Sequence, residues 1–307
     1  MSTVTVRAPA KINLGLSVGR PRADGYHPLA TVYQAIALYD EVRARPAPDG
    51  ELTVAVTGEG ADVVPLDGTN LAVRAAGLLA KSYGVEKGVA LSIHKTIAVA
   101  GGLAGGSADA AATLVACDAL WGLRAGREEL ASVAAELGSD VPFCLVGGNA
   151  LGTGRGELVS PVLSRGRFEW VLGYSATGLL TPHVYAEFDR LGGGAVGSGD
   201  DDAEPEVPEQ LMAALRTGDP YAVGPALHND LHAPALRLRP TLRSTLEVGE
   251  EFGALGAIVS GSGPTCLFLA ADEDHAVDLA VALSGSGTCR LVQRASGPVP
   301  GARLVTS

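Results

Sequence analysis

The sequence predicts an α+β fold, and three observations support this class. Residues 3–18 and 51–57 alternate apolar and polar side chains, which is typical of strands. Residues 71–82, followed by Gly84, have the apolar spacing and the terminal glycine of a helix. Both kinds of segment occur in both halves, without an internal repeat. A length of 307 residues with 47% hydrophobic residues suits one large or two ordinary domains with a full core.

Composition excludes several classes of function. The net charge of −11 argues against general binding to nucleic acids or anionic membranes, because both depend on clustered Lys and Arg. No apolar run reaches the roughly 18–20 residues of a membrane span, and the N-terminus lacks the layout of a secretion signal, so we expect a cytoplasmic protein. The six histidines form no metal-type cluster. The cysteines have neither metal-ligand nor disulfide spacing, and we interpret them as reduced filler residues: Cys117, Cys144, Cys266 and Cys289.

The N-terminal strand carries the first candidate site residues. We expect residues 3–18 to form a strand, to break at Pro9 and to continue as a second strand. Lys11 and Asn13 then share one face of the second run. On a solvent-facing strand this pair means little, but it would line a cleft if the strand borders a phosphate-binding loop.

A turn follows at residues 20–29 and displays Tyr26 and His27 together. A flat heterocycle could stack there, although a hairpin tip with solvated charges is the simpler interpretation. Further strands are expected at residues 31–39 and 51–57. The helix over residues 71–82 has Asn70 as its N-cap.

The strand at residues 89–94 leads into Lys95 and then into a glycine-rich stretch, residues 98–109. Glycine backbone can approach a phosphate closely and adopt positive φ angles. Ser107 offers a hydroxyl where we expect the next helix to begin, and a helix N-terminus favours anions. The stretch therefore predicts a phosphate cradle. Lys95 could reach the phosphate, although a lysine at a strand end is usually solvated.

Two familiar nucleotide motifs do not fit this stretch. No Gly-Lys-Ser/Thr closes it, and no βαβ unit with a ribose-binding acid frames it. The alternative to a phosphate cradle is a purely structural role, in which the glycines only let a helix pack closely on a sheet.

Asp140 follows a helix predicted over residues 127–137 and closed by Gly138. It stands just before another predicted helix start, with Pro142 in the first turn. Asp140 is therefore either a simple N-cap or an acid that the start of this helix holds for catalysis. A glycine-rich hairpin at residues 147–157 closes the first half.

The second half begins with a strand at residues 170–174 and a helix capped by Thr181 with Pro182 in first position. Residues 191–210 are rich in Gly, Asp, Glu and Pro and predict a mobile loop. A helical region is expected from residue 228 to about residue 246. Residues 257–270 predict a strand, a glycine turn and a second strand. A helix at 274–283 and a last strand at 289–294 complete the chain.

Taken together, these stretches resemble the GHMP kinase superfamily, named for the galactose, homoserine, mevalonate and phosphomevalonate kinases. Residues 9–14 match its first motif, residues 101–109 its phosphate loop and residues 259–264 its third motif. Within the superfamily, residues 22–27, 138–143 and 153–157 resemble the branch that acts on 4-diphosphocytidyl-2-C-methyl-D-erythritol.

The resemblance implies a two-lobed α+β GHMP-kinase fold with the active site in the cleft between the lobes. The N-terminal, ATP-binding lobe would cover residues 1–160 and the C-terminal lobe residues 161–307. The implied activity is ATP-dependent phosphorylation of the 2-hydroxyl of this sugar alcohol, in the methylerythritol phosphate route to isoprenoid precursors. Sister kinases acting on homoserine or mevalonate, and a non-catalytic nucleotide-binding regulator, are the alternatives.

The resemblance also assigns roles by position. Lys11 and Asp140 match the catalytic pair. The positions that match substrate contacts are Asn13, Tyr26, His27, Thr181 and Tyr185, of which Tyr26, His27 and Tyr185 form the cytosine pocket. The positions that match the ATP site are Ala98, Val99, Ala100, Gly101, Gly102, Leu103, Ala104, Gly105, Gly106, Ser107, Ala108 and Asp109.

The implied cofactors are ATP and Mg²⁺, with the metal held mainly by phosphates and water and Ser107 as a candidate contact. We expect a small-molecule substrate, no nucleic acid or membrane partner, and a monomer or weak homodimer. The chain departs from the family pattern in two places. Ala98 stands where proline is usual, and the acidic segment at residues 192–206 is longer than expected.

Overall fold

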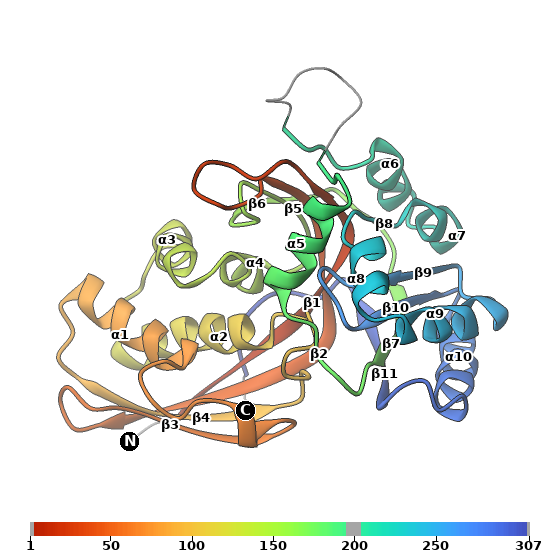
Figure 1. Cartoon of the computed structure of the whole chain (residues 1–307). Helices are drawn as coiled ribbons and strands as arrows, with labels where there is room; N and C mark the ends of the chain where they lie inside the picture. Colours follow the sequence, from red (N-terminus) through yellow and green to blue (C-terminus); the bar gives the residue numbers. More distant parts are fainter. Residues whose placement is uncertain (1–2, 195–203, 306–307) are drawn as a thin grey trace.

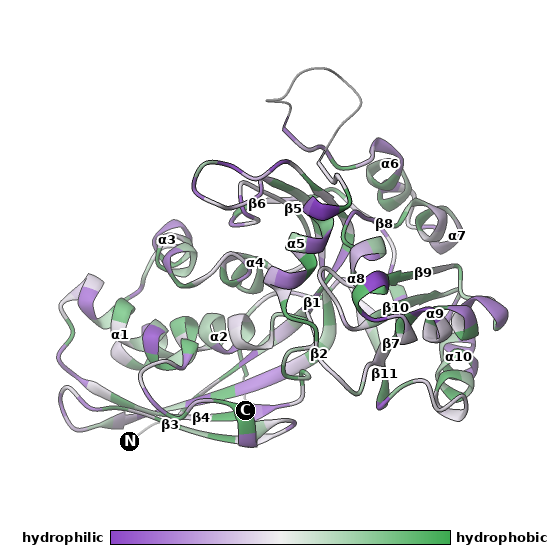
Figure 2. Cartoon of the chain, in the orientation of Figure 1, coloured by the Kyte–Doolittle hydropathy of each residue, from purple (hydrophilic) through white to green (hydrophobic). Residues whose placement is uncertain are grey.

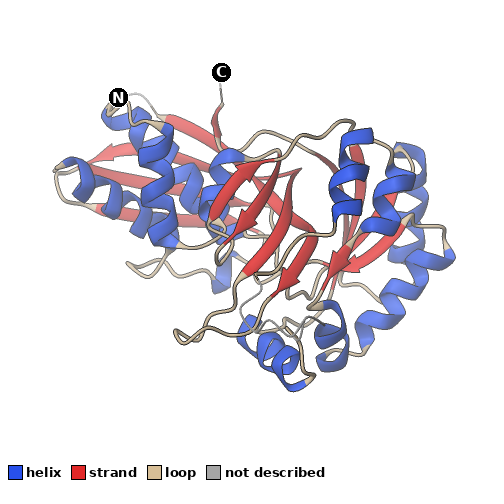
Figure 3. Cartoon of the chain, turned by 90° about the horizontal axis from the view of Figure 1, so that it is seen from above, coloured by secondary structure: helices blue, strands red, loops and turns tan. Residues whose placement is uncertain are grey.

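The computed structural model describes residues 3–194 and 204–305. It contains two β-sheets with helices packed against them (Figures 1 and 3), which confirms the predicted α+β class. The strands are β1 (Val4–Val18), β2 (Leu29–Ala47), β3 (Leu52–Gly58), β4 (Gly88–Lys95), β5 (Asn149–Thr153), β6 (Leu158–Pro161), β7 (Phe168–Tyr174), β8 (His228–Asn229), β9 (Gly256–Val259), β10 (Cys266–Ala270), β11 (Leu291–Gly297) and β12 (Arg303–Leu304). The helices are α1 (Leu71–Tyr83), α2 (Gly105–Trp121), α3 (Arg127–Leu137), α4 (Val141–Val146), α5 (Thr181–Arg190), α6 (Glu209–Thr217), α7 (Pro220–Val223), α8 (His232–Leu238), α9 (Thr241–Glu251) and α10 (Glu273–Gly285), with short 3₁₀ turns η1 (Ala61–Val63) and η2 (Gly224–Ala226).

The first sheet has the strand order β12-β1-β2-β4-β3, and β5, β6 and β8 extend it at its sides. The second sheet has the order β11-β7-β10-β9. Strands β8 and β12 come from the C-terminal part of the chain yet pair with β1. The boundary at residue 160 stays a prediction; the first sheet takes strands from both sides of it.

Strand β1 is one continuous strand, so the predicted break at Pro9 is wrong. Instead, its antiparallel register with β2 shifts at Pro9/Ala10 and again at Asn13/Gly15. Proline lacks an N–H, and the strand accommodates it by an irregularity in pairing rather than by ending. Both shifts flank the segment that carries Lys11 and Asn13.

Helix α2 packs against β1 and β2 as the central helix of the first lobe (Figure 1). Its alanine-rich sequence lets it be buried on most sides, with Ala108, Ala110, Ala111 and Ala112 fully covered. The helix begins at Gly105, and its N-cap residue is Ala104 in a left-handed conformation with φ of 59°. Ser107 therefore lies inside the first turn, and the prediction that its hydroxyl marks the helix start is wrong.

Most other predicted elements are confirmed. Helix α1 has Asn70 as its N-cap, which accepts a hydrogen bond from the Ala72 amide, and ends at Gly84 in the left-handed region. Helices α3 and α10 and strands β4, β7, β9 and β10 lie where the sequence predicted them, within a few residues.

The region after residue 228 is the main error. Strand β8 pairs in parallel with β1, and only then do α8 and α9 follow, interrupted near Pro240. Proline disfavours helical backbone in the residue before it, which explains why α8 ends before Pro240 and α9 begins after it. Strand β11 is also not the last, because β12 returns to β1. The predicted mobile loop at residues 191–210 includes residues 195–203, which lie outside the described residues, and its last two residues belong to α6.

Each sheet packs against an apolar core. The larger cluster lies between the first sheet and α1–α3 and continues across one face of the second sheet, where Trp170 and Leu267 belong to it. The second cluster covers the opposite face of the second sheet together with α5 and α8–α10. Figure 2 shows apolar and polar residues interspersed along the helices, as expected where one side of a helix packs on a sheet. Within the described residues, no helix has the length and apolar character needed to span a membrane.

Candidate active site

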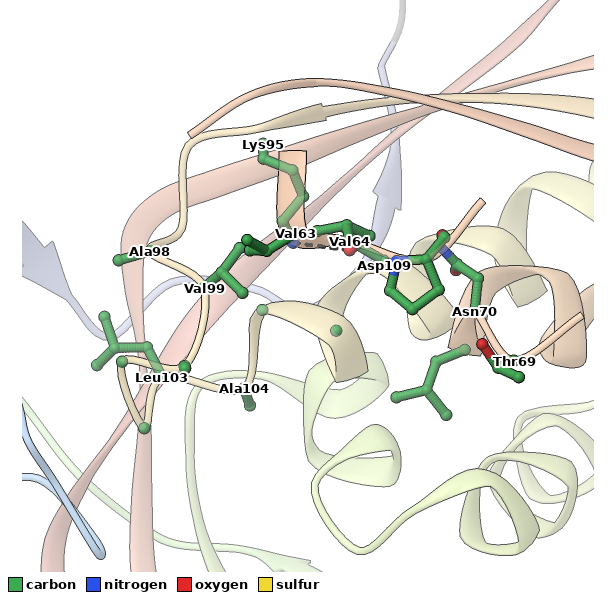
Figure 4. Close-up of a pocket in the computed structure, with 17 residues that line it drawn as sticks. Val63, Val64, Thr69, Asn70, Lys95, Ala98, Val99, Leu103, Ala104 and Asp109 are labelled. Carbon is green, nitrogen blue, oxygen red and sulfur yellow. Dashed lines mark hydrogen bonds and ion pairs between the residues drawn. The ribbon is translucent and has the colours of Figure 1, made fainter. Parts of the chain in front are cut away.

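The glycine-rich segment joins β4 to α2 and forms one wall of a cavity of about 340 Å³. Figure 4 shows Ala98, Val99, Leu103 and Ala104 on one side of this cavity, with Thr69 and Asn70 on the other. Positive φ angles at Ala100 (56°), Gly102 (75°) and Ala104 (59°) turn the backbone around the opening. Such a sequence of turns before a helix N-terminus presents backbone N–H groups to an anion.

Contacts from β1 and from the turn between β9 and β10 hold this cradle in place. The Lys11 amide on β1 donates to the Leu103 carbonyl at 3.1 Å. The Thr265 hydroxyl donates to the Gly101 carbonyl at 2.6 Å. A Cβ atom on Gly102 would lie 2.9 Å from the Gly263 carbonyl oxygen, so only glycine permits this approach of the turn at 261–263. The first, second and third predicted motifs therefore meet at one place.

Lys11 and Asp140, far apart in the sequence, face each other beside the cradle. The Lys11 Nζ lies 3.7 Å from Asp140 Oδ2 and donates to Asn13 Oδ1 at 2.8 Å. Asn13 in turn donates to the Thr31 hydroxyl at 2.8 Å. Lys11 is only 6% exposed, so its ammonium is fixed by these contacts rather than free in solvent.

Asp140 occupies the N-cap position of α4, yet its side chain makes no capping hydrogen bond. Its carboxylate instead faces Lys11 and the Tyr33 hydroxyl. Burial, reinforced by the charge of Asp140 and a hydrogen bond to it, holds the pKa of Tyr33 well above its ordinary value. The Tyr33 hydroxyl therefore stays protonated at physiological pH and donates a hydrogen bond to this carboxylate. Added Cβ atoms on Gly152 and Gly156 would collide with the Tyr33 ring and hydroxyl, so both glycines make room for it.

The Lys11–Asp140 pair lines a second cavity of about 300 Å³, which also includes Ser107, Thr181 and Tyr185. Gly102 and Ala104 border both this cavity and the first. Thr181 is the first residue of α5 rather than its cap, since the N-cap residue is Leu180. Its hydroxyl pairs with the Ser262 hydroxyl at 2.9 Å, which ties α5 to the third motif.

A third cavity, of about 470 Å³, collects the aromatic residues. His27 Nε2 bonds to Asp189 Oδ1 at 2.8 Å, and the ring centroids of His27 and Tyr185 are 4.9 Å apart. Tyr26 is 56% exposed, and the Arg155 guanidinium carbon lies 5.1 Å from its ring centroid. Arg155, Thr181 and Tyr185 border both the second and the third cavity.

The three cavities thus form a continuous series through their shared walls. An anion-binding loop lies at one end, an ammonium–carboxylate pair in the middle and a group of aromatic rings at the other end. This arrangement suits transfer of a phosphoryl group from a nucleotide to a hydroxyl whose remote end carries a flat ring.

Lys95 differs from the expectation of a solvated lysine, and it lines the first cavity, so its reach to a phosphate stays a prediction. It is 3% exposed and forms ion pairs with Asp40 and Asp109. Loss of hydration and the charge of Asp40 raise the pKa of Asp109 to about 8. The positive charge of Lys95 acts in the opposite direction and limits this increase.

Sequence reasoning also missed Asn229. Its side-chain amide donates to the carbonyls of Val259 at 2.7 Å and Gly261 at 2.8 Å, so it fixes the turn of the third motif. The residue lies on β8, within the region that the sequence predicted as helix. Only the parallel pairing of β8 with β1 places it there.

Comparison with known proteins agrees with this geometry. The model of the GHMP kinases N terminal domain matches residues 70–148, and that of the GHMP kinases C terminal domain matches residues 211–289. A 4-diphosphocytidyl-2-C-methyl-D-erythritol kinase from Nocardioides sp. is 55% identical over 302 residues, covering 98% of this chain and 99% of the relative. The same enzyme from Leifsonia xyli subsp. xyli is 53% identical and covers 100% of both chains.

Solved structures give the same picture. A crystal structure of 4-(cytidine 5′-diphospho)-2C-methyl-D-erythritol kinase superposes with a TM-score of 0.75 at 33% identity, covering 95% of this chain and 98% of that one. The mevalonate kinase of L. major has a TM-score of 0.74 at 18% identity, over 96% and 95% of the two chains, and so shares the fold. The chain belongs to the GHMP kinases and, within them, to the 4-diphosphocytidyl-2-C-methyl-D-erythritol kinase family.

Proposed function

We propose that the protein transfers the γ-phosphoryl group of ATP to the 2-hydroxyl of 4-diphosphocytidyl-2-C-methyl-D-erythritol, a step in the methylerythritol phosphate route to isoprenoid precursors. The observation that carries this proposal is the series of three cavities, with the Lys11–Asp140 pair at its centre. The relatives that match nearly the whole chain are named for this kinase, and they support the same substrate.

ATP is the phosphoryl donor expected of a GHMP kinase, and the cradle of residues 98–109 is the site that fits it. The positive φ angles and the start of α2 favour polyphosphate there. Among the described residues, no group of three or more His, Cys, Asp or Glu could cage a metal ion. Mg²⁺ would therefore be held by phosphate oxygens and water, with the Ser107 hydroxyl near them, and would offset the phosphate charge.

Asp140 and Lys11 divide the chemistry between them. As the 2-hydroxyl oxygen bonds to the γ-phosphorus, the bond from that phosphorus to the β–γ bridging oxygen breaks and ADP leaves. Asp140 accepts the hydroxyl proton. Lys11, held by Asn13 at 2.8 Å, stabilises the ionised carboxylate and the charge that develops between hydroxyl and phosphate. The Tyr33 hydroxyl helps to orient this carboxylate through its hydrogen bond to Asp140.

The third cavity recognises the cytidine end of the substrate. Tyr26 and Tyr185 border it and offer ring faces to a flat base, while the hydrogen bond to Asp189 fixes His27. Arg155 borders both this cavity and the reaction centre. A guanidinium between base and hydroxyl suits the diphosphate that links them, because it binds phosphate oxygens in pairs.

The alternatives explain less of the site. Homoserine and mevalonate have no base, so they would leave the cavity of about 470 Å³ and its aromatic residues without a ligand. A regulator that only binds nucleotide would have no use for the ammonium–carboxylate pair. We further propose a two-lobed protein divided near residue 160, acting as a monomer or weak homodimer in the cytoplasm. Its net charge of −11 supports the absence of nucleic acid and membrane partners.

A phosphorylation assay tests this function directly. The purified protein is supplied with ATP, Mg²⁺ and the diphosphocytidyl compound, with homoserine and mevalonate as separate controls. We expect ADP release coupled to phosphorylation of the cytidyl compound alone. Turnover of a control instead would overturn the assignment of the base pocket, and turnover of none would refute the kinase function.

A further inference from the structure

Asp40 breaks the pattern of the strand on which it lies. On β2, the alternate residues Leu38, Val42 and Ala44 turn into the main apolar core. Asp40 occupies the same row and is 0% exposed. An ionised carboxylate in such a row is strongly unfavourable unless other groups compensate its charge. Violations of local patterning of this kind concentrate at functional positions.

Three donors converge on the Asp40 carboxylate. Oδ1 accepts hydrogen bonds from the amides of Thr96 at 2.6 Å and Ile97 at 2.9 Å. Oδ2 pairs with the ammonium of Lys95. The same ammonium donates to Asp109 Oδ2 at 2.7 Å. Charge-assisted bonds to two consecutive backbone amides fix the backbone more firmly than a contact between side chains would.

These partners lie at both ends of the phosphate cradle. Residues 95–97 lead into it, and Asp109, its last residue, lies in the second turn of α2. The Lys95 ammonium also lies under the cradle itself, since a Cβ atom on Gly105 would be 3.2 Å from it. Figure 4 shows Lys95 and Asp109 beside the loop residues. Asp109 Oδ1 has no hydrogen-bond partner among the described residues, so the carboxyl group is held through Oδ2, which accepts from Lys95.

We propose that Asp40 is a positioning residue for the nucleotide. It does not border the cavity; it fixes the entry of the cradle and, through Lys95, its exit, so that the N–H groups of residues 98–106 are oriented before ATP binds. Preorganisation of this kind lowers the cost of ordering a loop on binding and so improves affinity. The inference rests on the proposed function only in taking the cradle to be the ATP site.

The Asp40→Asn variant tests this role. Asparagine keeps the shape and one acceptor oxygen, but its NH₂ group must then face either the ammonium or the two amides. We expect the Kd for a non-hydrolysable ATP analogue with Mg²⁺, measured by calorimetry, to rise at least about tenfold, as expected for loss of one charge-assisted bond. The KM for ATP should rise in parallel, and the KM for the diphosphocytidyl compound should stay within about twofold.

A matched control exists on α2, the helix that begins at the cradle. Asp118 Oδ1 accepts a hydrogen bond from the Ala125 amide at 2.9 Å, at the far end of α2. Asp118→Asn makes the same chemical change away from the cradle and should leave both KM values at the wild-type level. If Asp40→Asn lowers the melting temperature but binds the analogue with the wild-type Kd, Asp40 is only a structural residue and the proposal is wrong.

A measurement on the wild-type protein covers the case in which Asp40→Asn does not fold. Hydrogen exchange of the nucleotide-free protein should show protected amides at Thr96 and Ile97, because both are bonded to a buried carboxylate. Rapid exchange at these two amides would overturn the proposal. A failure of the proposed function would look different from either result. The wild-type protein would then bind the ATP analogue but would not phosphorylate the diphosphocytidyl compound.

Discussion

Replacement of Asp140 by asparagine should lower the rate of the reaction strongly while changing the stability of the fold little. The contacts of Asp140 show why the cost in stability is small. Asp140 lies at the N-cap of α4 without a capping hydrogen bond, so the variant loses none of the ~1 kcal/mol that a cap supplies. The Asp140 side chain is 31% exposed and 3.7 Å from Lys11 Nζ, and such a pair contributes at most about 1 kcal/mol. Lys11 keeps its bond to Asn13. The free energy of unfolding should therefore change by no more than about 1 kcal/mol.

The rate should change far more. Removal of a general base lowers turnover by roughly 10²–10⁴-fold. We expect kcat to fall in this range and the KM for ATP to change little, since the cradle is untouched. Steady-state kinetics with coupled ADP detection, beside urea unfolding followed by circular dichroism, measures both quantities.

A control with the same chemical change is available in Asp219→Asn. Asp219 caps α7 by accepting from the Tyr221 amide at 2.9 Å, and asparagine is an equally good cap. Both kcat and stability should remain at the wild-type level in that variant. Turnover of Asp140→Asn within about tenfold of wild type would refute the general-base role. A loss of several kcal/mol in stability would refute the structural reasoning about the cap.

Three further predictions follow from the site. His27→Ala removes the bond to Asp189 and the ring contact with Tyr185, so the KM for the cytidyl compound should rise at least about tenfold while that for ATP does not; equal effects on both would rule out the base pocket. Tyr33→Phe removes a donor to Asp140 and should lower kcat about five- to tenfold with unchanged melting temperature, and an unchanged kcat would show that the hydroxyl plays no part. Loss of hydration and the charge of Asp40 raise the pKa of Asp109 above its value in the unfolded chain, so the protein should be most stable below about pH 4 with respect to this group and should lose stability as pH rises toward about 8. Asp109→Asn should flatten this part of the pH–stability curve, and identical curves for variant and wild type would contradict the assigned shift.

The sequence by itself determined the local structures that rest on local signals. Asn70 and Gly84 mark the ends of α1 because capping and left-handed backbone depend on neighbouring residues only. The glycines of residues 98–109 indicated a phosphate loop for the same reason. A segment without side chains can approach a phosphate closely, and its glycines are read directly from the sequence. The resemblance to a kinase superfamily supplied the pairing of Lys11 with Asp140, which spacing alone could not.

The tertiary structure decided what depends on contacts between distant segments. Asp140 could have been an ordinary cap, and only the approach of β1 to the start of α4 gives its carboxylate a different partner. Lys95 looked solvated, but the pairing of β4 with β2 places it over Asp40 in the core. Asn229 was assigned to a helix because its partners, Val259 and Gly261, are unknown until β8 joins β1. Burial and ion pairing are properties of the packed chain, and no local pattern in the sequence encodes them.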